Sequence, residues 1–394
     1  MKKFLCLCCT ILLLTTGCGK KSSVDVVKEF SSRVNDTKSY VLKGTMEIYS
    51  DEDTFTYSVE ANYLKDNYYK VKLVNQTNNH EQVILRNQDG VYVITPSLNK
   101  SFKFQSEWPN NSSQSYLLKA IITDLEKDAE TSMETVDSKY VIKSKVNYPN
   151  NSDLSYQKVT LDKDMNLNKV EVYNSSDALK IKVNVGSIDL KAGLSDSDFK
   201  LEDYVKEPQD NPNNNTSNSN NATSNGNNNS NDSNTNSNEC KEGDKDCKPN
   251  VACDPKKEDC TEKNTTSKDK TTGVLEDIVY PLYIPSNTYL SGKDKVDTDN
   301  GERVILTFGG DKNFVLVEEV AVASNEFEII PVYGDPLMLN DTIAALSENS
   351  LYWTSNQVSY YLAGNDLTTE EILNIAKNMN QSSSVVSGNV SNEK

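Results

Sequence analysis

Histidine, tryptophan and arginine are scarce in this sequence of 394 residues. It contains one histidine, His80, and two tryptophans, and arginine occurs only at Arg33, Arg86 and Arg303. A Ser-His-Asp triad would have to include His80. This residue falls at the start of an expected strand and has no evident acidic or nucleophilic partner. A zinc hydrolase would have too few nitrogen ligands. We therefore expect no enzyme, no catalytic or metal-binding residue and no cofactor, and we expect His80 to be exposed on an edge strand.

Basic charge is also in deficit. Lysine and arginine total 41 against 58 acidic residues, which gives a net charge of −17 and argues against nucleic acid as a partner. The acidic excess is concentrated in residues 274–380, where it suits either a basic partner or simply a soluble surface. The carboxylate pairs Glu318-Glu319 and Glu370-Glu371 fall in an expected strand and in the first turn of an expected helix, so both pairs have structural explanations. Gly309-Gly310 is typical of a hairpin turn and not of a phosphate-binding loop.

The apolar run near the start of the chain, Phe4 to Leu14, is too short to cross a bilayer as a helix. It follows Lys2 and Lys3 and has the charge and length of an export signal. The segment that follows it, Thr15 to Cys18, resembles a bacterial lipobox, with Thr15 where an aliphatic residue is usual. The resemblance implies a lipid on the Cys18 thiol, removal of the signal peptide within residues 1–18, and anchorage to the outer face of the cell membrane or a spore membrane. The alternative is an ordinary cleaved signal and a free secreted chain.

Residues 206–273 have the composition of a disordered linker. They are rich in asparagine and serine and contain almost nothing that could fill a core. Four cysteines repeat a C-x6-C spacing there: Cys240, Cys247, Cys253 and Cys260. In an exported chain this pattern favours disulfides, with a four-thiolate zinc site and free thiols as alternatives, and it leaves the pairing open.

The stretch before the linker alternates helical and strand periods. Val24, Val27, Phe30 and Val34 recur at helical spacing after Ser22 and Ser23, which predicts a capped helix. Strict alternation at residues 55–63 and 69–73, with an earlier strand at 42–48, predicts an antiparallel meander. A second helix is expected at residues 116–125 with Ser112 or Ser113 as its cap, followed by four more strands.

Several motifs in residues 19–205 resemble those of the LolA/RseB-like lipoprotein-localisation fold, as found in sporulation and germination lipoproteins of clostridia. The motifs are Asp89-Gly90-Val91-Tyr92-Val93 with Pro96 and Asn99, Trp108-Pro109-x-Asn111, Ser115-Tyr116-Leu117-Leu118, and Asp124. The C-terminal segment LYWTSNQVSYYLAGNDLTTEEILNIAKNM resembles the closing hairpin and helix of a small domain that follows LolA-like domains.

The resemblance implies an α+β chain whose N-terminal domain is an open antiparallel half-barrel with helices in its mouth. A small α+β domain would occupy residues 274–380, and residues 381–394 would form a disordered tail. The implied hydrophobic cavity would be lined by alternating aromatic and aliphatic side chains, although the same side chains could simply pack beneath the second helix. They are Phe55, Tyr57, Val59, Tyr69, Val71, Val91, Val93 and Trp108.

Two functions remain open from the sequence. The first is a membrane-anchored module that binds a protein partner in envelope, sporulation or germination control. The second is a sensor or carrier of an acyl chain or other hydrophobic ligand in the half-barrel cavity. A shuttle across a periplasm is disfavoured, because a protein fixed by its own lipid cannot ferry cargo.

Overall fold

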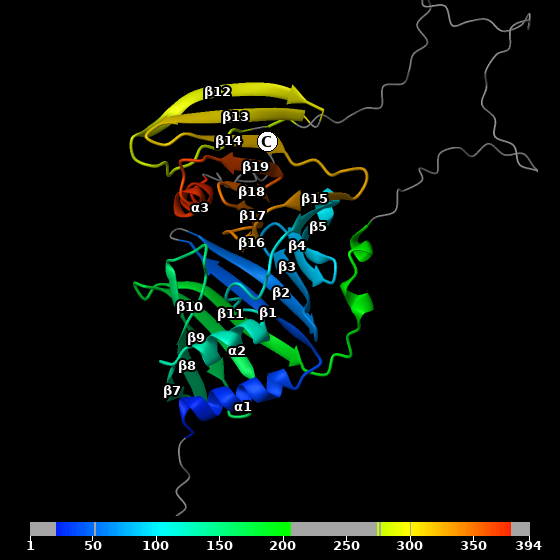
Figure 1. Ribbon diagram of the computed structural model, residues 1–394, viewed down its shortest axis with the longest axis vertical. Helices are drawn as coiled ribbons and strands as arrows, with labels where there is room; N and C mark the ends of the chain where they lie inside the picture. Colours follow the sequence, from blue (N-terminus) through cyan, green and yellow to red (C-terminus); the bar gives the residue numbers. More distant parts are fainter. Residues whose placement is uncertain (1–20, 51–52, 206–273, 276, 300, 380–394) are drawn as a thin grey trace, which may run out of the picture. The chain divides into compact units, whose positions relative to one another are not determined.

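The computed structural model describes residues 21–50, 53–205, 274–275, 277–299 and 301–379. The predicted signal peptide with Cys18, the predicted linker 206–273 with its four cysteines and the predicted tail 381–394 lie outside these residues. The described stretches on either side of residues 206–273 belong to one compact unit. The structure is mostly β, with three α-helices among the described residues (Figure 1).

Twelve of the described strands form one sheet, in the order β15-β6-β5-β4-β3-β2-β1-β11-β10-β9-β8-β7. Their bounds are β1 Ser39–Tyr49, β2 Thr54–Leu64, β3 Tyr68–Asn75, β4 Glu81–Asn87, β5 Gly90–Thr95, β6 Lys100–Phe104, β7 Ser132–Val136, β8 Lys139–Lys145, β9 Leu154–Leu161, β10 Leu167–Asn174, β11 Leu179–Asp189 and β15 Glu328–Val332. Single turns of 3-10 helix occupy Pro96–Leu98, Asp196–Phe199 and Glu202–Tyr204. The meander predicted for the first strands is confirmed, because β1 to β6 pair antiparallel with their sequence neighbours.

The first helix, α1, runs from Ser23 to Asn35 and confirms the predicted cap. The Ser22 hydroxyl accepts a hydrogen bond from the Asp25 N–H, and the Asp25 carboxylate accepts one from the Ser22 N–H. Val27, Phe30 and Val34 are buried as expected. Val24 is 69% exposed, so its place in the apolar stripe was predicted wrongly; Val26 lies on the buried side instead.

The second helix, α2, spans Leu118–Lys127 and begins later than predicted. Its N-cap is Leu117, whose side chain makes no capping hydrogen bond, so neither Ser112 nor Ser113 is the cap. Ser113 instead exchanges two hydrogen bonds with Asn147 in the loop between β8 and β9, each of 2.7 Å. The apolar side chains of α1, α2 and one face of the sheet form a single core.

Strand β15 pairs with the first sheet and not with its neighbours in sequence. It lies parallel to β6, with Glu328 opposite Lys100 and Val332 opposite Phe104. The sequence FEIIPVY was expected to belong to the C-terminal domain, and that expectation is wrong. By pairing with β6, β15 satisfies the backbone groups on what would otherwise be an open sheet edge.

The other described strands form a second sheet, in the order β12-β13-β14-β19-β18-β17-β16. Their bounds are β12 Thr288–Thr298, β13 Gly301–Gly310, β14 Phe314–Val320, β16 Asp335–Met338, β17 Ile343–Ser347, β18 Ser350–Ser355 and β19 Val358–Ala363, and helix α3 follows at Thr369–Lys377. The predicted start of α3 is confirmed, because Thr368 and Glu371 form a capping box. The buried side chains of α3, including Ile372 and Ile375, pack against this sheet in a second core.

Glu318 of β14 is a fully buried carboxyl group in this second core, with 0% of its surface exposed. One carboxyl oxygen, Oε2, accepts a hydrogen bond of 3.0 Å from the Val279 N–H, and the other has no partner among the described residues. Burial raises the pKa of Glu318 to about 7, from an ordinary value of 4.5. Its neighbour Glu319 instead forms an ion pair of 2.8 Å with Arg303.

We expect Glu318 to make stability fall as the pH rises. The native state retains a proton that the unfolded state releases, so the free energy of unfolding should decrease between the two pKa values, from about pH 4.5 to about pH 7. The decrease should be about 3 kcal/mol at most, from the two pKa values and 1.36 kcal/mol per unit. Urea unfolding at about pH 5 and about pH 8 would measure it, with Glu318→Gln as the control that lacks this proton. Equal pH dependence in the two proteins would contradict the expectation.

Candidate functional site

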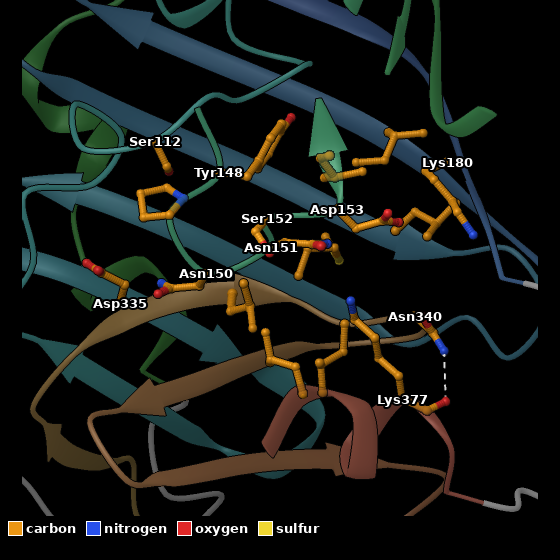
Figure 2. A pocket seen from close by; sticks show the side chains of 18 of the residues that line it. Ser112, Tyr148, Asn150, Asn151, Ser152, Asp153, Lys180, Asp335, Asn340 and Lys377 are labelled. Carbon is orange, nitrogen blue, oxygen red and sulfur yellow. Dashed lines mark hydrogen bonds between the residues drawn. The ribbon is translucent and has the colours of Figure 1, made fainter. Parts of the chain in front are cut away.

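A cleft of about 650 Å³ among the described residues is our candidate site (Figure 2). The first sheet contributes the end of β1 and the start of β11. The loop from Tyr148 to Asp153, between β8 and β9, forms one wall. Residues 335–340, at and after β16, form another wall, and α3 lines the remaining side with Leu373, Asn374 and Lys377.

Much of the wall is made of neutral polar side chains. Asn150, Asn151 and Ser152 come from the loop (Figure 2). Asn340 follows β16, and Asn374 lies in α3. Amide side chains both donate and accept hydrogen bonds, as a peptide backbone does. The cleft can therefore bind an extended peptide segment through polar contacts.

Apolar side chains make up about as much of the lining as polar ones. They include Ile48, Ile84, Leu154, Met338, Ile343 and Leu373. Such side chains offer a contact for one or two apolar groups of a ligand.

Lys377 places a positive charge at this site. It lies in the last turn of α3, and its backbone oxygen accepts a hydrogen bond of 3.2 Å from the Asn340 amide (Figure 2). Burial lowers the pKa of the Lys377 ammonium, Asp153 opposes that shift, and Lys180 adds to it. A carboxylate on a ligand would relieve the cost of this charge.

Buried polar contacts hold the loop wall in place. The backbone and hydroxyl of Ser113 bind Asn147 at the start of the loop, and Gln157 donates to the Asp124 carboxylate over 3.3 Å. Burial raises the pKa of Asp124 to about 6 and also raises the pKa of Tyr148, which lines the cleft. The loop is therefore tied to α2 and β9 and presents its amides from a fixed support.

Hydrogen bonds also join the two sides of the cleft. The Asp335 carboxylate accepts hydrogen bonds from the Ser106 hydroxyl and from the Asn111 amide, the latter of 2.9 Å. The Tyr57 hydroxyl donates to the Asn340 backbone oxygen over 2.9 Å.

The structure brings the eight predicted cavity residues together in one core. Phe55 is half-buried and packs against that core; the other seven are at most 3% exposed. They share this core with α1 and α2, and of the eight only Trp108 also lines the cleft. The residues that form most of the cleft were not predicted, and the run of turn-forming residues YPNNSD at 148–153 was the signal in the sequence for part of it.

His80 is not the exposed residue that the sequence predicts. It is half-buried just before β4, its Nε2 atom is enclosed without a hydrogen-bond partner among the described residues, and burial lowers the pKa of its imidazole. It does not line the cleft. Within the described part of the chain, no helix has both the length and the apolar character needed to span a membrane.

Comparison with known proteins gives consistent sequence matches. Residues 1–197 match the family model described as "Sporulation protein YdcC-like". Over 374 residues, the chain is 32% identical to Sporulation protein YdcC of Bacillus subtilis (strain 168), and the alignment covers 95% of each protein. The predicted similarity to sporulation proteins of spore-forming bacteria is thus confirmed.

Solved structures are similar at much lower sequence identity. A chain of the Pseudomonas aeruginosa MucA/MucB complex matches 90% of this chain and 98% of its own length, with 9% identity and a TM-score of 0.29. A putative outer membrane lipoprotein-sorting protein domain from Vibrio parahaemolyticus matches 46% of this chain and 97% of its own, with 14% identity and a TM-score of 0.31. The complex of the CwlD amidase with the GerS lipoprotein of Clostridioides difficile matches 44% of this chain and 98% of its own, with 17% identity and a TM-score of 0.26.

Proposed function

Because the chain belongs to the Sporulation protein YdcC-like family, we propose that it binds a segment of a protein partner in its cleft during sporulation or germination. The proposal includes anchorage on the extracytoplasmic face of a membrane through a lipid on Cys18, and disulfides among Cys240, Cys247, Cys253 and Cys260. It also retains the predicted half-barrel at residues 19–205, the linker at 206–273 and the small domain at 274–380.

The observation that supports a protein partner is the set of amide and hydroxyl side chains that share the lining of the cleft with apolar ones. Asparagine and serine side chains from the 148–153 loop, residues 335–340 and α3 point to a ligand with hydrogen-bonding groups of its own. The apolar face of the sheet is filled by α1 and α2, whose side chains Phe30 and Ile121 are at most 2% exposed. The proposal contains no catalytic step.

The second candidate is a hydrophobic ligand. It is supported by the apolar strip of the cleft, which includes Ile48, Ile84 and Leu373. An acyl chain would bury apolar surface there at about 25 cal/mol per Å², but the amides around it would gain nothing from hydrocarbon.

A photo-crosslinking amino acid at Asn151 tests the proposed partner site. In sporulating cells we expect a discrete crosslinked protein from position 151, and none from Tyr289, an exposed position on β12 that does not line the cleft. Filling the cleft with Asn374→Trp should remove the crosslink by occupying the space of the partner. A crosslink that survives Asn374→Trp, or that also forms at Tyr289, would contradict the proposed site.

A native mass spectrum of the same chain without its lipid separates the two candidates. Bound mass of acyl-chain size that organic extraction removes would support the hydrophobic ligand. An empty protein together with an Asn151 crosslink would support the protein partner.

A further inference from the structure

Strands β7 to β11 lie side by side in the first sheet (Figure 1). Their outer face carries a group of lysines that the cleft does not use. Residues alternate between the two faces of a sheet, and on these strands Ile142, Val159 and Val170 point into the core and are fully buried. Their neighbours therefore point outward. We call this surface the lysine face, and its lysines are Lys139, Lys143, Lys145, Lys158, Lys169 and Lys182.

The lysine face has a charge opposite to that of the whole chain. The chain has a net charge of −17, whereas the outward positions of these five strands hold the six lysines and three acidic residues, Glu134, Glu171 and Asp189. Part of this charge is neutralised, because Lys145, Lys169 and Lys182 form ion pairs with Glu130, Glu171 and Glu47.

The remaining lysines have no carboxylate partner among the described residues. Lys143 and Lys158 stand directly opposite each other on β8 and β9. Like charges in that position destabilise a sheet, and an anion bound to both would remove the penalty.

Two tyrosines lie between these lysines. The rings of Tyr156 and Tyr173 stack 5.0 Å apart, the Lys143 ammonium lies 3.7 Å from the centre of the Tyr156 ring, and that of Lys158 lies 5.2 Å from the Tyr173 ring. Tyrosine and lysine together are typical of surfaces at the level of lipid headgroups, where the ring is half-immersed and the ammonium meets phosphate.

Among the described residues, the core around Phe199 does not extend over the lysine face, in contrast to the outer face of β3 to β5. Over β3 to β5, the outer face is covered by the segment around Phe199, which packs on Tyr68, Leu85 and Tyr92 in a core of its own.

The start of α1 lies close to the same end of the sheet. Lys21, the first described residue, is near enough to Tyr140 of β8 for the two to interact electrostatically. Tyr140 packs on the core side of β8, so this contact places Lys21 beside the strand but not on the lysine face itself. Lys21 is three positions after Cys18, a reach of at most about 10 Å. If Cys18 carries the lipid, the strands nearest the membrane include β8 and its neighbours.

We propose that the lysine face docks on anionic phospholipid headgroups and so orients the protein on its membrane. The site is separate from the cleft. Each lysine near an anionic bilayer contributes about 1 kcal/mol, a factor of about five in partitioning.

The test uses the full mature chain with Cys18→Ser, which cannot be lipidated, and vesicles of equimolar phosphatidylglycerol and phosphatidylcholine. We expect the Cys18→Ser chain to sediment with these vesicles and not with vesicles of pure phosphatidylcholine. Binding should be lost when added salt shortens the Debye length from about 10 Å to about 3 Å. Replacing the two unpaired lysines that face each other, in Lys143→Gln with Lys158→Gln, should weaken partitioning about 25-fold.

The matched control removes two lysines that also lie over tyrosine rings, Lys103 and Lys293, at 5.4 and 5.7 Å from Tyr92 and Tyr280. Lys103→Gln with Lys293→Gln should leave partitioning within about two-fold of the parent chain. If the glutamine pair at 143 and 158 does not fold, Lys143→Arg with Lys158→Arg keeps the charge and should bind like the parent.

Several outcomes would overturn the proposal. They are no binding to the anionic vesicles, equal binding to both vesicle types, or full binding by the variant at 143 and 158. Retention on an acidic peptide without binding to vesicles would assign the face to a protein and overturn the lipid assignment. None of these results depends on the Asn151 crosslink, so failure here and failure of the partner site are distinguishable.

Discussion

Trp108→Ala is expected to lower the free energy of unfolding by about 3 to 5 kcal/mol, because it removes the largest side chain of the first core. Trp108 is 1% exposed, and its ring packs edge-on against Tyr69 with 6.0 Å between ring centres. Its backbone oxygen also accepts a hydrogen bond from Arg86. Since Trp108 also lines the cleft, the crosslink from position 151 should be lost with it.

Urea unfolding followed by circular dichroism measures the effect. Val24→Ala is the matched control on an exposed site and should change stability by less than about 0.5 kcal/mol. A loss below about 1 kcal/mol for Trp108→Ala would show that this ring is not packed as described.

The second large effect is expected at Gln82, whose buried amide joins the two sheets. Gln82 lies on β4 and is 5% exposed, and its oxygen accepts hydrogen bonds from the Ile343 N–H over 2.6 Å and the Thr342 hydroxyl over 3.1 Å. Its amide nitrogen donates to the Ile343 backbone oxygen over 3.3 Å. Gln82→Leu would leave these buried groups unpaired, at about 1 to 3 kcal/mol for each.

We therefore expect Gln82→Leu to lose about 3 kcal/mol or more. Hydrogen exchange should become faster at the amides of Thr342 and Ile343, the residues that Gln82 binds. Gln76→Leu, which removes an exposed amide with a single contact to Ser58, is the control and should leave exchange at these amides unchanged. Unchanged exchange in both variants would mean that Gln82 does not hold the sheets together.

Local signals in the sequence predicted the helices and the early strands well. Ser22 with Asp25 and Thr368 with Glu371 mark helix starts through short-range hydrogen bonds that depend only on neighbouring residues. The alternation in β2 marks its buried face for the same reason, because strand geometry alone puts every second side chain on one side.

Strand partners were harder to predict than strands. FEIIPVY falls within the small domain expected at residues 274–380, but its residues contain no information about the strand beside it. In the structure β15 pairs with β6, more than two hundred residues earlier in the chain. Strand β12 was missed because it is an edge strand with polar residues on both faces, so it has no apolar alternation.

The candidate site was the least predictable part. The apolar residues expected to line a cavity fill a core, because α1 and α2 pack on them. The cleft is assembled from a loop at 148–153, residues 335–340 and α3. These segments lie far apart in the sequence and meet through long-range contacts that include those of Gln82, Asp335 and β15. The residue pattern within one segment does not show which distant segments it contacts in the folded protein.

Because β15 pairs with β6, the two sheets do not depend on the covalent chain between them to stay together. Residues 100–104 and 328–332 pair through backbone hydrogen bonds, and Gln82 accepts a hydrogen bond from Ile343. The described chain is interrupted after Val205 and resumes at Val274. A single peptide-bond cut between those points would yield two fragments that remain bound as a complementing pair. Doubling the length of the intervening stretch would cost only about 0.6 kcal/mol in closure entropy. The strand pairing and the buried Gln82 amide stabilise the arrangement of the two sheets. Related proteins can therefore differ in the length and composition of the intervening stretch and still form the cleft.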